Sequence, residues 1–347
     1  MIREITRPPT AKCTLPTYVS FLLSEPKNTS CLRLSEIDGV SHDSVNRFLN
    51  REAYEPIDLF NEVKKHIALE GGTLGVDDTV IDKPYAKYIA YIGYFWSGKH
   101  HKSVKGINLI TLYYTDPQGH QQPVNYRIYD KSEGKTKNDY FLEMLAEVLS
   151  WGLRPYYMTG DSWYSSARNL KQVKKHQLNF LFGIESNRLV SVQKGTYTQV
   201  QHLDISEDGL IVWLKDFGYV KVYRTHLKNQ VRHYAMHVSE SELNNIARNT
   251  FEKIHSEHWG IEQYHRTIKQ VCNIEHFQVR GKVAVQNHVF SSLLAFTQLQ
   301  VMRVADVISN CYRLHRDLFN QVISSFINDF SPKLNHMNPA FGAVVNA

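Results

Sequence analysis

The order of short apolar runs after residue 72 constrains the fold of this chain most strongly. Runs rich in β-branched and aromatic residues predict three consecutive strands, at 74–80, 106–114 and 123–129. A helix, a strand, a helix and a strand are predicted next, at 138–149, 156–160, 165–176 and 179–184. This order is typical of an α/β domain with one mixed sheet, in which the first three strands are antiparallel.

The regions on either side of these elements have different patterns. Residues 1–66 predict short helices separated by turns, and Ser41 is a good N-cap for a helix in which Val45 and Phe48 have helical spacing. We expect a helix-turn-helix here. Residues 189–240 return to strand-like alternation, which we interpret as an inserted β-rich subdomain outside the central sheet.

The remainder of the chain is predicted to be helical. The α/β domain thus has a first part at 67–188 and a second part at 241–306, and 307–347 form a last helix and a tail. The individual helices are predicted at 241–248, 256–271, 283–304 and 313–327.

Composition excludes several classes of protein. The formal net charge of +6 on 347 residues favours an anionic partner without identifying one. The four cysteines form no Cys-x-x-Cys pair, which indicates reduced thiols rather than a disulfide framework. No apolar run approaches the roughly 20 residues that span a bilayer, and the charged, proline-containing start does not resemble a signal peptide. We therefore expect a cytoplasmic protein.

Acidic residues follow two of the predicted strands. Asp77 and Asp78 end the strand that begins at Leu74, and Asp161 follows the strand at 156–160. The carboxyl ends of neighbouring strands in α/β sheets open onto one crevice, so these acidic residues are expected to meet. Burying unpaired carboxylates is costly, which indicates a cation or a charged partner. Turn formation by the first pair and helix capping by Asp161 remain open as alternatives.

A third acidic residue lies in the segment from Trp259 to Lys269. Read as a helix, this segment has one polar face, formed by Glu262, His265, Arg266 and Lys269. Trp259 and Tyr264 lie elsewhere on the helix and are expected to anchor it to the sheet. An ordinary solvated face with charge pairs is the alternative interpretation.

Two Asp and one Glu suit the task of holding two hard cations. Mg²⁺ prefers oxygen ligands in near-octahedral geometry and usually keeps water and substrate phosphate as its remaining ligands. Two such ions a few Å apart activate a water or a 3′-hydroxyl on one side of a phosphodiester and stabilise the leaving oxygen on the other. Arg266 and Lys269 would then position the anionic backbone near the ions, and His265 would contact phosphate with them.

Together the three segments resemble the DDE transposases of bacterial insertion sequences, the cut-and-paste group with a β-strand insertion before the catalytic Glu. The resemblance covers roughly Gly72 to Val304. In that family the first acidic residue is the Asp directly before a Thr, which corresponds to Asp78 and makes Asp77 its neighbour. The second follows an apolar strand, as Asp161 does. The Glu lies in a Trp-x-x-Glu helix followed by an aromatic residue, His, a basic residue and Lys, matching Glu262, Tyr264, His265, Arg266 and Lys269.

The resemblance implies a ribonuclease H-like mixed sheet flanked by helices, with a β-rich insertion and an N-terminal helical DNA-binding region. It implies that Asp78, Asp161 and Glu262 are catalytic and hold two Mg²⁺ ions, with Mn²⁺ able to substitute. It also implies terminal inverted repeats and target DNA as substrates, a homodimer on paired ends, and a place in the bacterial cytosol or nucleoid.

Some residues depart from the family pattern. His255 and His258 stand where the fuller signature has a Tyr and an Arg that contact phosphates beside a flipped base of a DNA hairpin, so the resemblance does not extend to a hairpin step. His258 would reach phosphate when protonated. Trp213 is a candidate for stacking on an extruded base, with sheet packing as the alternative. His255, His258, Cys272 and His276 also have spacings that a structural zinc site would accept.

The helix that begins after Ser41 is a candidate for recognising DNA. Its polar side chains lie away from the apolar stripe and include His42, Asn46, Arg47, Asn50 and Arg51. Asn and Arg pair with base edges in the major groove, and Arg also binds phosphate. We interpret this face as the one that recognises transposon ends; a polar outer face of a helix packed on the catalytic domain is the alternative.

The sequence therefore predicts a DNA transposase that cleaves transposon ends in a metal-dependent reaction and transfers the strands into target DNA. One alternative is a structure-selective nuclease of the same fold, which would cleave but never join. Another is a transposase-derived DNA-binding protein that has lost catalysis.

Overall fold

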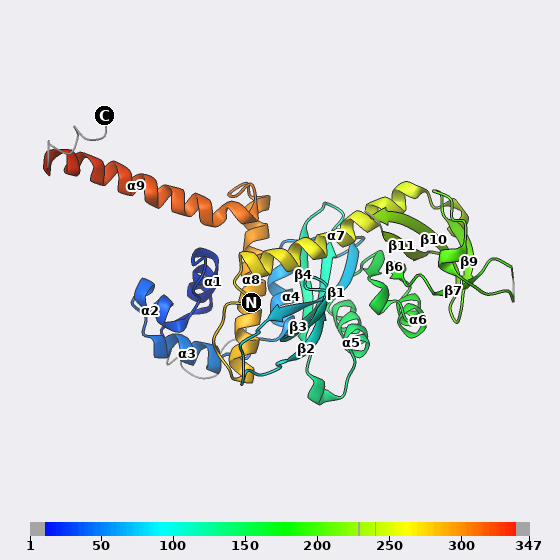
Figure 1. Cartoon of the computed structure of the whole chain (residues 1–347), viewed down its shortest axis with the longest axis horizontal. Coiled ribbons are helices and arrows are strands. Elements are labelled where there is room, and N and C mark those ends of the chain that lie inside the picture. The colour runs from blue at the N-terminus through cyan, green and yellow to red at the C-terminus, as the bar shows by residue number, and fades with distance from the viewer. Residues whose placement is uncertain (1–10, 194, 228–229, 240, 338–347) are drawn as a thin grey trace.

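The computed structural model describes residues 11–193, 195–227, 230–239 and 241–337. Figure 1 shows its helical N-terminal region at one end, the central sheet in the middle and the β-rich region at the other end. Two long helices, α7 (Arg248–Gln270) and α8 (Lys282–Val304), connect these parts.

Five strands form the centre of the sheet. They are β1 (Thr73–Asp82), β3 (Lys102–Thr115), β4 (Gln121–Ile128), β5 (Tyr157–Gly160) and β6 (Asn179–Ile184). β3 pairs antiparallel with β1 and β4, whereas β5 runs parallel to β1 and β6, which produces the spatial order β4–β3–β1–β5–β6. This confirms the predicted ribonuclease H-like sheet with an antiparallel first half.

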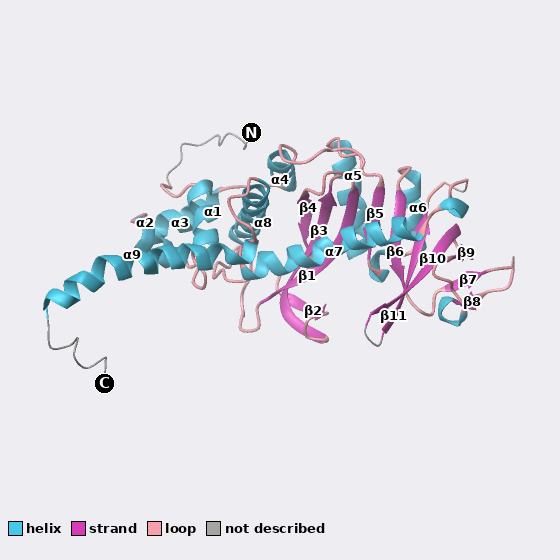
Figure 2. Ribbon diagram, turned by 90° about the horizontal axis from the view of Figure 1, so that it is seen from above, coloured by secondary structure: helices cyan, strands magenta, loops and turns pink. Residues whose placement is uncertain are grey.

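Helices cover both faces of this sheet. α5 (Lys137–Ser150) and α6 (Ala167–Lys175) pack on one face, and α7 crosses β1, β3 and β5 on the other (Figure 2). The core between these layers is closely filled: Val76, Leu112, Phe141 and Phe182 are fully buried. Burial of such side chains is the main stabilising contribution, at about 1.5–3 kcal/mol for each large apolar residue.

One strand near the first acidic pair is absent from the sequence prediction. β2 (Gly93–Ser97) pairs antiparallel with the start of β3 and forms an edge of the sheet. Its consecutive aromatic residues, Tyr94, Phe95 and Trp96, hide the period of two by which strands are recognised. In the structure the burial of these side chains alternates as expected for a strand, because Phe95 is buried while Tyr94 and Trp96 are exposed.

The β-rich region extends the central sheet, which corrects its interpretation as a subdomain outside that sheet. β11 (Gln230–His237) pairs antiparallel with β6. The sheet continues outward through β10 (Gly218–Leu227), β9 (Leu210–Leu214), β7 (Leu189–Ser191) and β8 (Thr198–Gln199). The edge of β6 would otherwise leave backbone N–H and C=O groups unpaired, and β11 satisfies them. Alternation reveals a strand in the sequence, but it does not reveal the partner of that strand.

The N-terminal region consists of four helices. They are α1 (Leu15–Ser24), α2 (Cys31–Asp38), α3 (His42–Arg51) and α4 (Pro56–Val63). α2 ends at Gly39, whose φ of 67° is left-handed, and the side chain of Ser41 caps α3 by accepting from Ser44 N. The short turn between α2 and α3 has the length expected for a helix-turn-helix.

Buried side-chain amides fix this region to the catalytic part of the chain. Asn287 on α8 donates through Nδ2 to the backbone oxygens of Leu49 and Glu52, at 2.7 and 2.6 Å, where α3 ends. Asn273 donates in the same way to two backbone oxygens at the end of α1. Carbonyl groups at helix ends lack intrahelical partners, so these amides satisfy them in a buried interface.

The C-terminal helices differ in extent from their predictions. The helix expected at 241–248 is wrong, because that segment forms only a short 3-10 turn at Leu243–Asn245. The helix expected at 256–271 begins earlier, at Arg248, because no glycine or proline interrupts residues 248–259. α9 (Leu314–Met337) runs past the predicted end at 327 and projects away from the body (Figure 1). Across the described ranges, no helix combines the length and apolar character that crossing a membrane requires.

Candidate active site

The two faces of β1 carry different chemistry. Successive side chains of a strand point to opposite faces, so Thr73, Gly75 and Asp77 share one face and Asp78 lies on the other. The hydroxyl of Thr73 donates to Glu257 on α7 at 2.5 Å. A Cβ atom built on Gly75 would lie 3.7 Å from Nδ1 of His258, also on α7. The odd-numbered residues of β1 therefore face α7.

Asp161 directly follows β5 and lies near both Asp77 and Asp78. In the parallel pairing of β1 with β5, Val76 lies opposite Gly160, so Asp77 and Asp161 are the next two residues to emerge side by side. Burial first, and then the negative charge of Asp161, raise the pKa of Asp77 well above its usual value. The side chain of Asp161 also accepts a hydrogen bond from Trp163 N at 3.0 Å. The residue therefore also caps the short helix at 162–164, which is the alternative role considered from the sequence.

Glu262 reaches this cluster from α7. One oxygen each from Asp77 and Glu262 and one ring nitrogen of His265 lie within 4.8 Å of one another. Glu262 is exposed, whereas Asp77 and His265 expose only 15% and 8% of their side chains. Of the described residues, these three form the group with the right atoms and spacing to hold a metal ion.

Asp78 has a different set of neighbours on the opposite face. Its Oδ2 accepts from Lys137 Nζ and from Asn108 Nδ2, both at 2.6 Å, and its Oδ1 accepts from the Tyr164 hydroxyl at 2.9 Å. Three donors therefore hold the carboxylate that the sequence singled out as the first metal ligand. The prediction for Asp78 stays a prediction, and Asp77 is the carboxylate that the strand turns toward Glu262.

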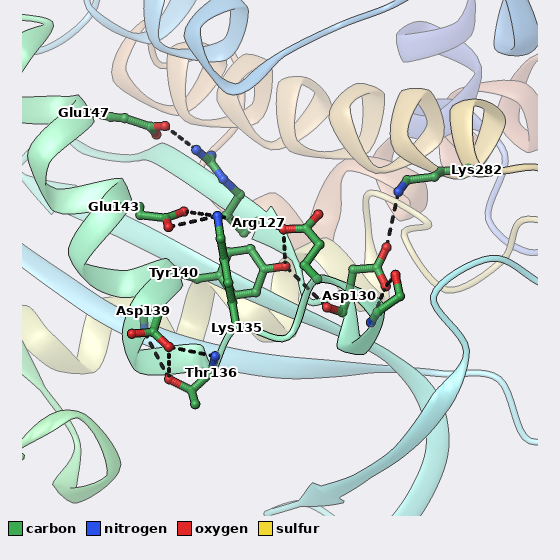
Figure 3. Close-up of polar contacts among 11 residues, drawn as sticks. Arg127, Asp130, Lys135, Thr136, Asp139, Tyr140, Glu143, Glu147 and Lys282 are labelled. Atoms are coloured by element: carbon green, nitrogen blue, oxygen red, sulfur yellow. Dashed lines mark hydrogen bonds and ion pairs between the residues drawn. The ribbon is translucent and has the colours of Figure 1, made fainter.

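The start of α5, which supplies Lys137, is held by a network of polar contacts (Figure 3). Thr136 and Asp139 form a reciprocal capping box at the helix N-terminus. Ion pairs on either side join Lys135 to Glu143, Arg127 to Glu147 and Lys282 to Asp130. These contacts order the loop before α5. They thereby fix the backbone from which the flexible Lys137 side chain reaches Asp78.

The pKa values reflect a crowded acidic cluster. Loss of solvent around the carboxyl group, and then the charge of Asp78, raise the pKa of Asp161 to about 6, although the residue as a whole remains exposed. Lys137 acts in the opposite direction and lowers it. Burial lowers the pKa of His265 to about 3 and that of His258 to about 4, so both rings are neutral near pH 7.

The two α7 histidines nearest the acidic cluster, His258 and His265, differ in their hydrogen bonds. Nδ1 of His258 lies 3.1 Å from the Thr159 hydroxyl. With its pKa lowered, this ring does not carry the charge that would attract phosphate at neutral pH. His265 lies 3.6 Å from Asp77, too far for a direct hydrogen bond, and its Nε2 is buried without a hydrogen-bond partner.

The two basic residues of α7 that were predicted to position DNA, Lys269 and Arg266, have different surroundings. Lys269 donates to the backbone oxygen of Val80 at 2.5 Å and pairs with Glu275 at 3.3 Å, so it ties α7 to the end of β1. Arg266 is exposed, as is Trp259. Tyr264 anchors α7 by packing on Tyr113, but the expected anchoring role of Trp259 is wrong, because half of that side chain faces solvent.

The other candidate residues lie far from one another in the fold. On α3, Asn46, Arg47 and Asn50 are exposed on the polar face as predicted, whereas Arg51 pairs with Glu52. Trp213 on β9 is 40% exposed and packs edge-on against Tyr219. His255, His258, Cys272 and His276 do not form a metal group in the described part of the chain.

Sequence reasoning missed Lys137, Tyr164 and Asn108, the three partners of Asp78. Tyr164 carried a usable signal, because it follows Asp161 by three residues in the turn that the strand opens into. Lys137 and Asn108 carried none, because they approach Asp78 from a helix and a strand that only the folded sheet brings together.

The fold and this cluster define a class of protein. A ribonuclease H-like sheet, with acidic residues beside one another on β1 and β5 and a Glu on the helix that crosses them, is the architecture of polynucleotidyl transferases and nucleases that use divalent ions. The family model described as Transposase DDE domain matches residues 70–297. The chain belongs to this family and is a DDE transposase.

Solved structures agree with the fold. A piggyBac transposase synaptic complex with hairpin DNA matches over 94% of this chain and 72% of that chain, with 14% identity and a TM-score of 0.50. The NurA nuclease from Sulfolobus solfataricus covers 86% of this chain and 96% of its own at 10% identity, and a Drosophila P element transposase strand transfer complex covers 91% and 87% at 7%. Their TM-scores, 0.26 and 0.20, are too low to support an argument. No curated protein sequence matches the chain.

Proposed function

We propose that this transposase cleaves DNA at the ends of its element and joins the freed 3′ ends to target DNA. Asp77, Asp161 and Glu262 are the proposed carboxylate ligands, with Asp77 in place of Asp78. Two observations support this most: β1 pairs with β5 up to the residues just before Asp77 and Asp161, and α7 brings an oxygen of Glu262 within 4.8 Å of one of Asp77.

The donor set fits divalent cations such as Mg²⁺ or Mn²⁺. Carboxylates that raise one another's pKa have no reason to gather unless a positive charge offsets their repulsion. The buried Nε2 of His265 also lacks a hydrogen-bond partner among the described residues, so this polar atom is free to interact with water or an ion. When bound, a pair of ions would supply an activated water or 3′-hydroxyl and a stabilised leaving oxygen.

The residues of the chain then have separate tasks. Asp77 and Glu262 present oxygen atoms from the strand and the helix, and the neutral ring of His265 offers a nitrogen beside them without adding charge. Lys137 offsets the charge of Asp78 and keeps the pKa of Asp161 from rising further. Arg266, exposed one turn beyond Glu262, is placed to contact the phosphate backbone.

The exposed face of α3 is the proposed reader of the element's ends. Asn46, Arg47 and Asn50 present donors and acceptors suited to base edges. Because side-chain amides from α8 and from the loop before it hold the ends of α3 and α1, the distance between end recognition and cleavage is set by the fold. Two ends must be cut and joined together, so we propose that a homodimer forms on paired ends.

The test uses a duplex carrying the terminal inverted repeat from the DNA beside the coding region, together with a plasmid target. Purified protein with Mg²⁺ should cut at the repeat and join the labelled 3′ end to the plasmid, and Asp161→Ala should do neither. Cleavage without joining would instead identify a nuclease. End binding without any cleavage, under conditions where Asp161→Ala behaves like the unaltered protein, would identify a DNA-binding protein without catalysis.

A further inference from the structure

The segment 83–105 has an unusual composition that the active site does not explain. It contains five lysines, two histidines and six aromatic residues, and no aspartate or glutamate. It forms the connection from β1 to β2, β2 itself and the start of β3. Asp82, just before the segment, pairs with His100 at 3.0 Å and with Lys99 at 3.7 Å.

Four aromatic rings of this segment face solvent. Tyr85 is 94% exposed, Tyr88 79%, Tyr94 66% and Trp96 65%. Soluble proteins seldom leave so many large rings together in water without a partner for them. Lysines guard an edge strand such as β2 against pairing with other chains, but that role explains the charges and not the rings.

Strand register places two of these rings on the face of the sheet that carries the carboxylates. Tyr94 pairs with Lys105, and Trp96 with Ser103, so these side chains share one face. Thr111 on β3 lies on that same face, because it pairs with Asp77 and contacts Tyr264 of α7. The surface made of Tyr94, Trp96 and Lys105, hereafter the β2 platform, thus continues the face that holds Asp77.

We propose that the β2 platform binds unpaired bases of a DNA strand, which stack on Tyr94 and Trp96 while lysines of the segment contact the phosphates. DNA as the partner rests on the proposed function. Its negative charge complements a segment without acidic residues, whereas a second copy of this chain would be repelled by the same lysines. Bases inside a duplex stack on one another, so solvent-facing rings need a strand whose bases are free.

The experiment measures binding of the full chain to two labelled oligonucleotides in the presence of EDTA, so that catalysis plays no part. One is a single strand of about 16 nucleotides, the upper end of known site sizes, and the other is the blunt duplex of the same sequence. The variant Tyr94→Ala/Trp96→Ala should bind the single strand at least about tenfold more weakly, as expected for lost stacking. Its duplex affinity should stay within about twofold of the unaltered protein.

Two further variants separate stacking from charge and from misfolding. Tyr94→Phe/Trp96→Phe keeps both rings and should retain single-strand affinity. Lys102→Gln/Lys105→Gln should weaken binding to both oligonucleotides and reduce its dependence on salt. Because Tyr94 and Trp96 are exposed, the alanine variant should keep the thermal unfolding midpoint of the unaltered protein.

The proposal is overturned if the alanine variant binds the single strand normally, or if it loses affinity for the duplex to the same degree. The proposed function fails separately, if the unaltered protein neither cuts nor joins transposon ends in Mg²⁺. Weaker single-strand binding by the alanine variant in EDTA would then still establish the β2 platform as a DNA surface. Normal cutting by the unaltered protein, with normal single-strand binding by the alanine variant, would overturn only the proposal for the β2 platform.

Discussion

Asp77 and Asp78 are adjacent in sequence and occupy opposite surroundings. Asp77 turns toward α7, where it meets Glu262 and His265 and where its pKa is raised. Asp78 turns toward α5 and α6, where Lys137, Asn108 and Tyr164 all donate to it. Asp77 is thus surrounded by other acidic groups, whereas hydrogen-bond donors hold the carboxylate of Asp78.

The contrast shows how a strand can build a metal site and its support at once. A carboxylate that is to bind an ion must keep lone pairs available, whereas one that holds a lysine in place gives its lone pairs to donors. The alternation of side chains along β1 separates these tasks by a single peptide unit. Four experiments test whether the two carboxylates have different roles.

The largest difference is expected between Asp77→Asn and Asp78→Asn. Both substitutions preserve shape and remove one charge, so they are matched. Loss of a proposed ligand should reduce cleavage on the order of 10³-fold or more. Loss of a residue that acts through a neighbour should reduce it by about 10- to 100-fold. Rates of end cleavage measure both, and a greater loss in Asp78→Asn would restore Asp78 as the ligand.

Metal addition should distinguish the same two variants without any DNA. An ion that binds only the folded state at 100 times its Kd stabilises that state by about 2.7 kcal/mol. Mg²⁺ should therefore raise the unfolding temperature of the unaltered protein and of Asp78→Asn, by about 2–4 °C for each kcal/mol. Asp77→Asn should show no such rise. Equal stabilisation of both variants in calorimetry would mean that neither face is specific for the ion.

The pH dependence tests the connection between the two faces. The pKa of Asp161 is about 6, so this carboxylate becomes available to an ion as pH rises through that value, and protons displace the ion below it. Lys137 lowers this pKa, so Lys137→Met should raise it and move the rising limb of the activity profile to higher pH. The loss at neutral pH should be about tenfold. If the rising limb of the pH–activity profile stays at the same pH in Lys137→Met, then Lys137 does not affect the pKa of Asp161.

The smallest effect is expected from Gly75→Ala, on the face that carries Asp77. The added Cβ would lie 3.2 Å from the Thr159 hydroxyl and 3.7 Å from Nδ1 of His258. The second distance is an ordinary contact, but the Thr159 hydroxyl must move by a few tenths of an ångström. We expect a cost of about 1 kcal/mol in the free energy of unfolding, measured in urea. Stability equal to that of the unaltered protein would show that the Thr159 side chain moves away without cost.

Much of the architecture could be predicted from local patterns. The runs at 74–80 and 179–184, the capped helix after Ser41 and the polar face with Glu262 all depend on neighbours within a few turns or strand residues. The pairing of β11 with β6 could not be predicted in this way, because alternation does not specify a partner. β2 was hidden because three consecutive aromatic residues mask its period.

The amino-acid sequence was sufficient to identify the family, the main elements of the central sheet, and Asp77, Asp78, Asp161 and Glu262 as candidate acidic residues. The folded structure was needed to show that Asp77, rather than Asp78, lies near Glu262, and that Lys137 approaches Asp78 from a separate helix. The reason is physical. The amino-acid order specifies alternation along a strand, but the face that a helix covers depends on packing across the whole sheet.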